Sequence, residues 1–137
     1  MTPVIPAVGD APDPRTFGPL TRADFVRYAG ASGDFNPVHY DDGFARDAGF
    51  PSVFSQGMHQ AALLGGFVTD WLGAANLRRF AVRFRAQVWP GDVLACAGRV
   101  VTVQETSEGV LVGVELTCSR QTGDVAVAGS ADFLLTP

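Results

Sequence analysis

The chain has few charged residues and no excess of positive charge. Charged residues make up 18% of its 137 residues, and ten Lys and Arg residues stand against fourteen Asp and Glu residues, for a net charge of −4. We expect no nucleic-acid partner, because a phosphate backbone is bound by a basic surface. The hydrophobic fraction of 47% excludes a disordered chain. So little polar surface predicts a buried subunit interface.

Cysteine is scarce, and recognisable targeting signals are lacking. Cys96 and Cys118 are the only cysteines, and they stand far apart, without the paired spacing of a metal site. We therefore expect two reduced core residues, no metal and no cofactor. The first residues lack the basic start and apolar run of a signal peptide. We expect a cytoplasmic protein that does not bind a membrane.

The chain length fits one hydrophobic core and is short for two. Residues 1–14 are rich in proline and small residues, which predicts an extended N-terminal arm. Residues 15–137 then form a single domain. Its first half predicts three helices, over residues 21–30, 41–49 and 57–73. The third is long and almost free of charge, so we expect it to be buried on most of its sides.

From residue 78 onward the hydrophobic period changes to two, which is typical of strands. Four strands are predicted, over residues 78–89, 91–103, 109–119 and 123–135, with Gly, Pro and polar residues between them. One long apolar helix followed by an antiparallel meander predicts an α+β fold, in which a curved sheet wraps around that helix. Such a sheet has exposed edges, which favours pairing across a two-fold axis.

The stretch SGDFNPVHYDD, residues 32–42, combines residues that favour a rigid turn. Gly33 permits unusual backbone angles, Asn36 can close an Asx turn, and Pro37 fixes its own φ. Such a turn can point Asp34 and His39 at one water, and a carboxylate with an imidazole forms a general acid–base pair. From the spacing alone a second interpretation stays open. Asp34 would cap a helical segment, and His39 would be a hydrogen-bonded core residue.

The run YAGASGDFNPVHYDDGFA, residues 28–45, resembles the signature of the MaoC-like, (R)-specific enoyl-CoA hydratases, also called hydratase 2. The likeness continues through residues 51–73 and the strands that follow. It implies the hot-dog fold and the reversible addition of water to trans-2-enoyl thioesters, giving (3R)-3-hydroxyacyl thioesters of coenzyme A or a carrier protein. It also implies that Asp34 and His39 are catalytic. The residues expected to support them are Ser32, Gly33, Asn36 and Pro37.

This reaction builds enolate charge on the thioester oxygen, which calls for a preorganised donor. The resemblance places that oxyanion donor at the N–H of Gly57, where the predicted long helix begins and its N–H groups are free. The family has His-Gly-Met at this point, whereas this chain has Gln56 before Gly57. Because the expected donor is the backbone N–H of Gly57, having Gln in place of His before it does not remove the donor. The expected substrate-binding residues are Gln56, Met58 and His59.

Several interpretations remain open from the sequence. Arg78, Arg79, Arg83 and Arg85 form either the solvated face of a strand or a contact for the phosphates of coenzyme A or a carrier arm. A hot-dog acyl thioesterase is an alternative function, as is an acyl-binding partner subunit of a heteromeric dehydratase. The resemblance implies a homodimer, or a heterodimer with a related hot-dog subunit.

Overall fold

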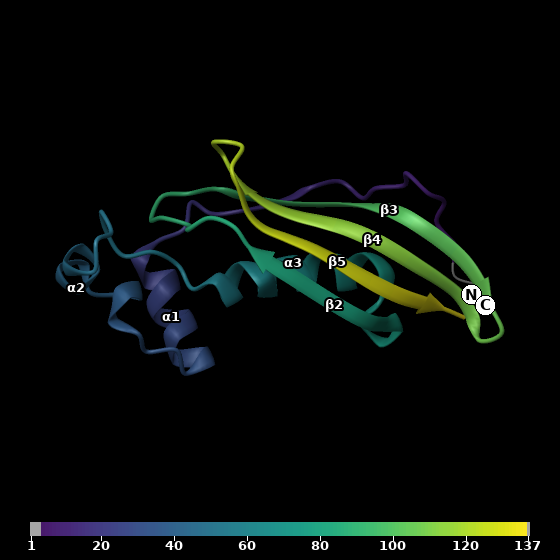
Figure 1. The fold of residues 1–137 in the computed structure, drawn as a ribbon, viewed down its shortest axis with the longest axis horizontal. Helices are drawn as coiled ribbons and strands as arrows, with labels where there is room; N and C mark the ends of the chain where they lie inside the picture. Colours follow the sequence, from purple (N-terminus) through teal and green to yellow (C-terminus); the bar gives the residue numbers. More distant parts are fainter. Residues whose placement is uncertain (1–3, 137) are drawn as a thin grey trace.

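The computed structural model describes residues 4–136. Five strands form one antiparallel sheet in the order β1-β3-β4-β5-β2. The sheet curves over one long helix, α3 (Gly57–Leu72), which packs against β2, β3, β4 and β5 and is joined to β1 by an ion pair between Arg15 and Asp70 (Figure 1). The predicted arrangement of a curved sheet around a central helix is therefore confirmed. The strands are β1 (Arg15–Phe17), β2 (Leu77–Phe84), β3 (Leu94–Thr106), β4 (Gly109–Arg120) and β5 (Val125–Leu135).

Two strand predictions need correction. The strand predicted over residues 78–89 ends at Phe84, because the N–H groups of Arg85 and Ala86 both donate to the carbonyl of Ala126 and the ladder stops there. Residues 85–88 then leave the sheet. Strand β1 was not predicted, since three residues are too few to show an alternating pattern. Before β1, residues 9 and 10 of the N-terminal arm also lie along β3, where they exchange backbone hydrogen bonds with Val100.

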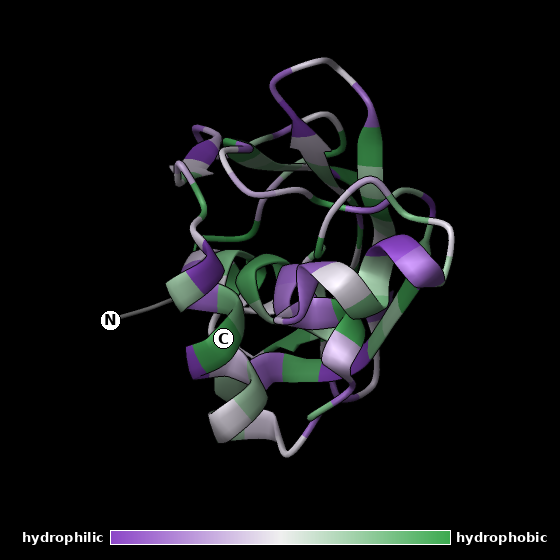
Figure 2. Ribbon diagram, turned by 90° about the vertical axis from the view of Figure 1, so that its left-hand side faces the viewer, coloured by the Kyte–Doolittle hydropathy of each residue, from purple (hydrophilic) through white to green (hydrophobic). Residues whose placement is uncertain are grey.

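The two short helices begin where the sequence predicts. In α1 (Arg22–Ser32) the Thr21 hydroxyl accepts from the N–H of Asp24 at 3.2 Å, and the Asp24 carboxylate accepts from the N–H of Thr21 at 2.8 Å. Helix α2 (Asp42–Asp47) is capped by the side chain of Asp41. Single turns of 3₁₀ helix follow α1 and α3, namely η1 (Pro37–His39) and η2 (Ala74–Asn76). Seen from the end that carries α1 and α2, hydrophilic and hydrophobic residues are interspersed along the helices (Figure 2). The residues that α1 and α2 bury are Phe25, Ala29 and Ala45.

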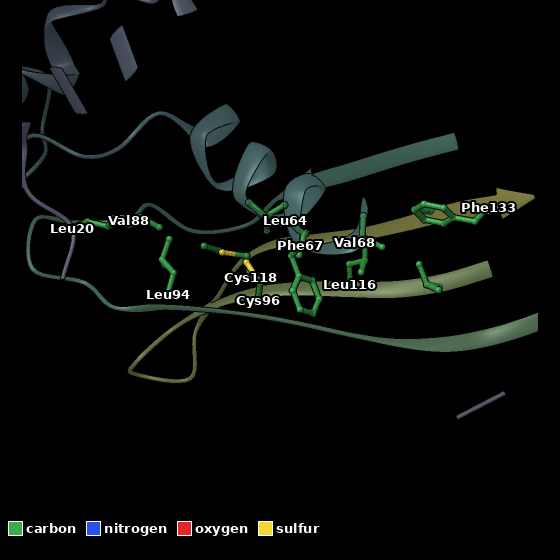
Figure 3. Packing of buried hydrophobic residues seen from close by; sticks show 14 of the residues in the cluster. Leu20, Leu64, Phe67, Val68, Val88, Leu94, Cys96, Leu116, Cys118 and Phe133 are labelled. Atoms are coloured by element: carbon green, nitrogen blue, oxygen red, sulfur yellow. The ribbon is translucent and has the colours of Figure 1, made fainter. Parts of the chain in front are cut away.

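The core lies between α3 and the sheet. Leu64, Phe67 and Val68 point from α3 toward Leu116 of β4, and Leu64 and Val68 are fully buried (Figure 3). The prediction that α3 is buried on most of its sides is confirmed. Its exposed residues form a single stripe, and the rest of the helix is buried or half-buried; the stripe consists of Met58, Ala62, Gly66 and Asp70. Among residues 4–136, no helix is both long enough and apolar enough to cross a membrane.

Cys96 and Cys118 lie directly opposite one another in the β3–β4 register. Both are fully buried and neither forms a disulfide, so the prediction of two reduced core residues is confirmed. Their sulfur atoms lie beneath α3, near Leu64 and Phe67 (Figure 3). The hydrogen bond with the Cys118 thiol, together with burial, raises the pKa of the Cys96 thiol. This pair therefore acts as small apolar packing between the two central strands.

Candidate functional site

The turn between α1 and η1 is built by short-range hydrogen bonds. Helix α1 ends at Gly33, whose φ of +76° lies in the left-handed region that glycine adopts without strain. The Ser32 hydroxyl donates to the carbonyl of Tyr28 at 2.7 Å and accepts from the N–H of Asp34 at 3.2 Å. Ser32 and Gly33 therefore fix the point at which Asp34 leaves the helix.

The second half of the turn holds His39. The side-chain oxygen of Asn36 accepts from the N–H of Val38 at 3.2 Å, and Pro37 opens η1. The N–H of Asn36 donates to Oδ1 of Asp34 at 3.3 Å. Asn36 thus closes the Asx turn that the sequence predicts, and its side-chain oxygen is already occupied by this local contact.

Asp34 and His39 meet at the end of this turn. Oδ2 of Asp34 lies 3.5 Å from Nε2 of His39. Nδ1 of His39 lies 2.7 Å from the carbonyl oxygen of Phe54, which can only accept, so the ring proton is on Nδ1 when the ring is neutral. Nε2 then carries a lone pair and faces a carboxylate oxygen. Oδ2 of Asp34 and Nε2 of His39 can therefore both accept hydrogen bonds from one shared donor, such as a water molecule.

The two side chains differ in their exposure to solvent. His39 is buried, with 9% of its side chain exposed, and its ring packs edge-on against the ring of Phe54 at 5.2 Å. Asp34 keeps 46% of its side chain exposed. The imidazole is therefore held rigidly from behind, while the carboxylate faces the opening through which a substrate would arrive.

The N-terminus of α3 lies in the same cleft. Gln56 gives no side-chain cap to α3, and no hydrogen bond within residues 4–136 uses the N–H of Gly57 or of Met58. These groups carry the positive end of the helix dipole. The ring of Phe84 lies so close to Gly57 that an added Cβ would stand 2.9 Å from its Cδ1 atom. A larger residue at this position would therefore have to displace the Phe84 ring.

An open cleft of about 390 Å³ joins these features. One wall comes from the turn and from α3, and the other comes from the segment that leaves the sheet after β2. A hydrogen bond of 2.8 Å from the N–H of Ser55 to the carbonyl of Val88 holds the two walls together. The lining residues are Asp34, Phe54, Ser55, Gly57, Met58, Gln60, Phe84, Arg85, Ala86 and Gln87.

Of the three residues predicted to bind substrate, the structure places only Met58 in this cleft. Gln56 is buried, and its amide donates to the carbonyl of Phe25 at 3.0 Å, which ties α3 to α1. His59 stacks on Tyr28 with ring centroids 4.9 Å apart. Burial lowers the pKa of His59, and the charge of Asp24 only partly opposes this shift. His59 follows Gly57 by two positions on α3, and residues two apart on a helix do not share a face. Its side chain therefore points away from the cleft.

Ser55 and Gln60 belong to the cleft and were missed by the sequence analysis. The amide of Gln60 donates to the Ser55 hydroxyl at 2.7 Å, and both residues are buried. The sequence signal for Ser55 and Gln60 was that they are polar residues in and next to the apolar segment that forms α3. Phe54 was also missed, because it contributes a backbone carbonyl, which no residue type reveals. Within residues 4–136 no three His, Cys, Asp or Glu side chains gather as a metal site would require.

The family of the MaoC like domain matches residues 4–120 of the chain. "Fatty acid synthase subunit beta" of Aspergillus oryzae is 36% identical over 107 residues, which are 66% of this chain and 5% of that protein. The mitochondrial "3-hydroxyacyl-[acyl-carrier-protein] dehydratase" of Arabidopsis thaliana is 26% identical over 113 residues, which are 82% of this chain and 68% of that protein. The chain thus spans about two thirds of the plant relative and a small part of the fungal one.

Solved structures agree with these matches. The (R)-hydratase of A. caviae superposes with a TM-score of 0.83 at 26% identity, covering 95% of this chain and 97% of that one. A chain of the ChsH1-ChsH2 complex of Mycobacterium tuberculosis superposes with a TM-score of 0.83 at 21% identity, covering 96% of this chain and 100% of that one, which shows the fold. The chain therefore belongs to the MaoC-like domain family and has its hot-dog fold.

Proposed function

We propose that the protein is a hydro-lyase that reversibly hydrates trans-2-enoyl thioesters to (3R)-3-hydroxyacyl thioesters. The observation that carries this proposal is the Asp34–His39 pair, whose two acceptor atoms lie 3.5 Å apart. Asp34 lines the same cleft as Gly57, and His39 lies directly behind it. This arrangement supplies both things the reaction needs, a base for water and a donor for the enolate. Relatives named as hydratases and dehydratases support the proposal.

In the hydration direction, His39 accepts a proton from water at Nε2 while the water oxygen bonds to C3 of the substrate. The electrons of the C2=C3 bond move toward the thioester and give an enolate. Asp34 remains ionised, orients the water and stabilises the imidazolium that forms. The imidazolium then returns its proton to C2, which regenerates the neutral ring. Dehydration follows the same steps in reverse.

The enolate oxygen is stabilised by the N–H of Gly57 at the start of α3. Because that N–H has no hydrogen-bond partner in the described part of the chain, its alignment costs little when the charge develops. The carbonyl of Phe54, fixed against Nδ1, stabilises the charged ring in the same step. Water and proton are handled by one pair of side chains, so both additions occur on one face of the substrate. The similarity to an (R)-hydratase supports the (3R) configuration.

The test is the loss of enoyl-thioester absorbance when purified protein is mixed with crotonyl-CoA, with chromatographic identification of the product. We expect (3R)-3-hydroxybutyryl-CoA and no free thiol. Release of coenzyme A would instead indicate the thioesterase alternative. Protein that binds the thioester without converting it would indicate an acyl-binding subunit. The reaction as written consumes no cofactor, and we propose none.

We also propose that a second hot-dog subunit pairs with the outer edge of β2. Strand β2 ends the sheet, so one of its sides has unpaired backbone groups. Beside it, between β2 and α3, runs an apolar groove lined by residues that include Ala61, Ala62, Gly65 and Phe80. A relative of this fold forms the ChsH1-ChsH2 complex. Light scattering should give about twice the 14.4 kDa chain mass, and a monomer with full activity would contradict this assembly.

A further inference from the structure

Most arginines of this chain are neutralised by acidic side chains within the structure. Ion pairs of 2.7–3.3 Å join six of them to Asp or Glu, and Arg78 donates to two backbone carbonyls. Within residues 4–136, the guanidinium groups of Arg46, Arg83 and Arg85 form no hydrogen bond or ion pair. The six paired residues are Arg15, Arg22, Arg27, Arg79, Arg99 and Arg120.

Of the three unpaired arginines, Arg85 alone lines the catalytic cleft. Arg46 is on α2. On β2, Phe80 and Phe84 contact Gly65 and Gly57 of α3. Because side chains alternate along a strand, Arg83 lies on the opposite face of the sheet. Arg83 and Arg85 are thus two exposed, unpaired arginines, two residues apart, of which one faces the cleft.

The cleft contains one acidic side chain, that of Asp34, and it forms no ion pair with Arg85. In a protein with a net charge of −4, an uncompensated cation at the rim of a catalytic cleft is a place where an anionic part of the substrate is attracted. The reacting end of an enoyl thioester is uncharged. The anion recognised there must therefore belong to the group that carries the acyl chain.

We propose that Arg85 binds a phosphate of the group that carries the acyl thioester, an inference that rests on the proposed function. A guanidinium presents paired N–H donors that match two phosphate oxygens. The phosphate ester of 4′-phosphopantetheine is common to coenzyme A and to carrier-protein arms, and coenzyme A adds further phosphates on its nucleotide. This contact is far from C2 and C3, so it stabilises ground state and transition state equally. Its loss therefore raises KM and leaves kcat unchanged.

Binding of coenzyme A itself tests this contact without any turnover. Calorimetry should show that Arg85→Ala weakens coenzyme A binding about tenfold, as expected for one charge-assisted hydrogen-bonded contact. The matched control Arg83→Ala, an exposed arginine on the other face, should leave the affinity unchanged. The difference between the parent protein and Arg85→Ala should shrink as salt rises. Equal effects of the two substitutions, or no effect of either, would overturn the proposal.

Three crotonyl thioesters identify the phosphate. Crotonyl-pantetheine has no phosphate, and its KM should be the same for the parent protein and for Arg85→Ala. A raised KM for both crotonyl-phosphopantetheine and crotonyl-CoA assigns Arg85 to the phosphate shared with carrier arms, and a raised KM for crotonyl-CoA alone assigns it to the nucleotide. An equal change with all three thioesters would overturn the contact. Coenzyme A binding that depends on Arg85 but occurs without hydration would refute the proposed function and leave this inference standing.

Discussion

Replacing Gly57 with alanine should separate activity from stability. The added Cβ would stand 2.9 Å from Cδ1 and 3.0 Å from Cε1 of Phe84, well inside normal carbon–carbon contact of about 3.5–4.0 Å. The Phe84 ring is 53% exposed, so it can move by roughly 0.5–1 Å instead of unfolding the protein. Any such movement occurs at the cleft wall that faces the N–H of Gly57.

The substitution therefore changes the space in which the thioester oxygen binds. Misplacement of a reacting group by about 1 Å costs on the order of 100-fold in rate, so we expect kcat/KM to fall by about 10- to 100-fold. The melting temperature should stay within a few degrees, because alanine is favoured over glycine in a helix by about 1 kcal/mol. The control is Gly30→Ala on α1, where an added Cβ meets nothing within 4 Å. It should gain stability and keep full activity. Unchanged kcat/KM in folded Gly57→Ala would refute the placement of the thioester at Gly57.

Three further predictions concern the supports of the site. Asp92 is buried and accepts from Arg120, Gln121 and the N–H of Trp89; burial opposes ionisation, but these hydrogen bonds lower the pKa of Asp92. Its contribution to stability is full above about pH 3.9 and is lost as pH falls through the lower folded pKa. In urea unfolding, the free energy of unfolding of Asp92→Asn should be about 3 kcal/mol lower than that of the parent protein at pH 7. This difference between the two proteins should become smaller below about pH 3. Leu64→Ala should cost about 2–5 kcal/mol in the same assay, and more than Leu63→Ala; equal losses would contradict the packing. Nitrogen NMR should find neutral His39 protonated at Nδ1, because the carbonyl of Phe54 accepts there, and a proton on Nε2 would contradict the proposed base.

Local patterns in the sequence predicted local structure well. Thr21 and Asp24 form the capping box that starts α1, and the alternating residues of β4 form a strand with nearly the predicted bounds. The end of β2 could not be predicted in this way. Residues 85–88 continue the alternating pattern, but their partners are Ala126 and Ser55, which are distant in sequence. Period-two patterning identifies a strand and does not show where its partner strand ends.

The candidate site shows the same limit. The turn residues Gly33, Asn36 and Pro37 suggested a rigid corner, and the family resemblance singled out Asp34 and His39. No pattern indicates that the carbonyl of Phe54 accepts from His39, since a backbone group is present at every position. The three residues around Gly57 were predicted together as substrate contacts. Helical geometry separates them, because Met58 faces the cleft while His59 stacks on Tyr28.

The central claim is that Asp34 and His39 together move the proton of one water. The most direct test compares crotonyl-CoA hydration by the parent protein with that by Asp34→Asn and His39→Ala, each checked for an unchanged fold by circular dichroism. Removing a general acid–base group costs about 10²–10⁴-fold in rate, so both variants should lose activity by this factor and still bind coenzyme A. Hydration at the parental rate by either folded variant would contradict the account.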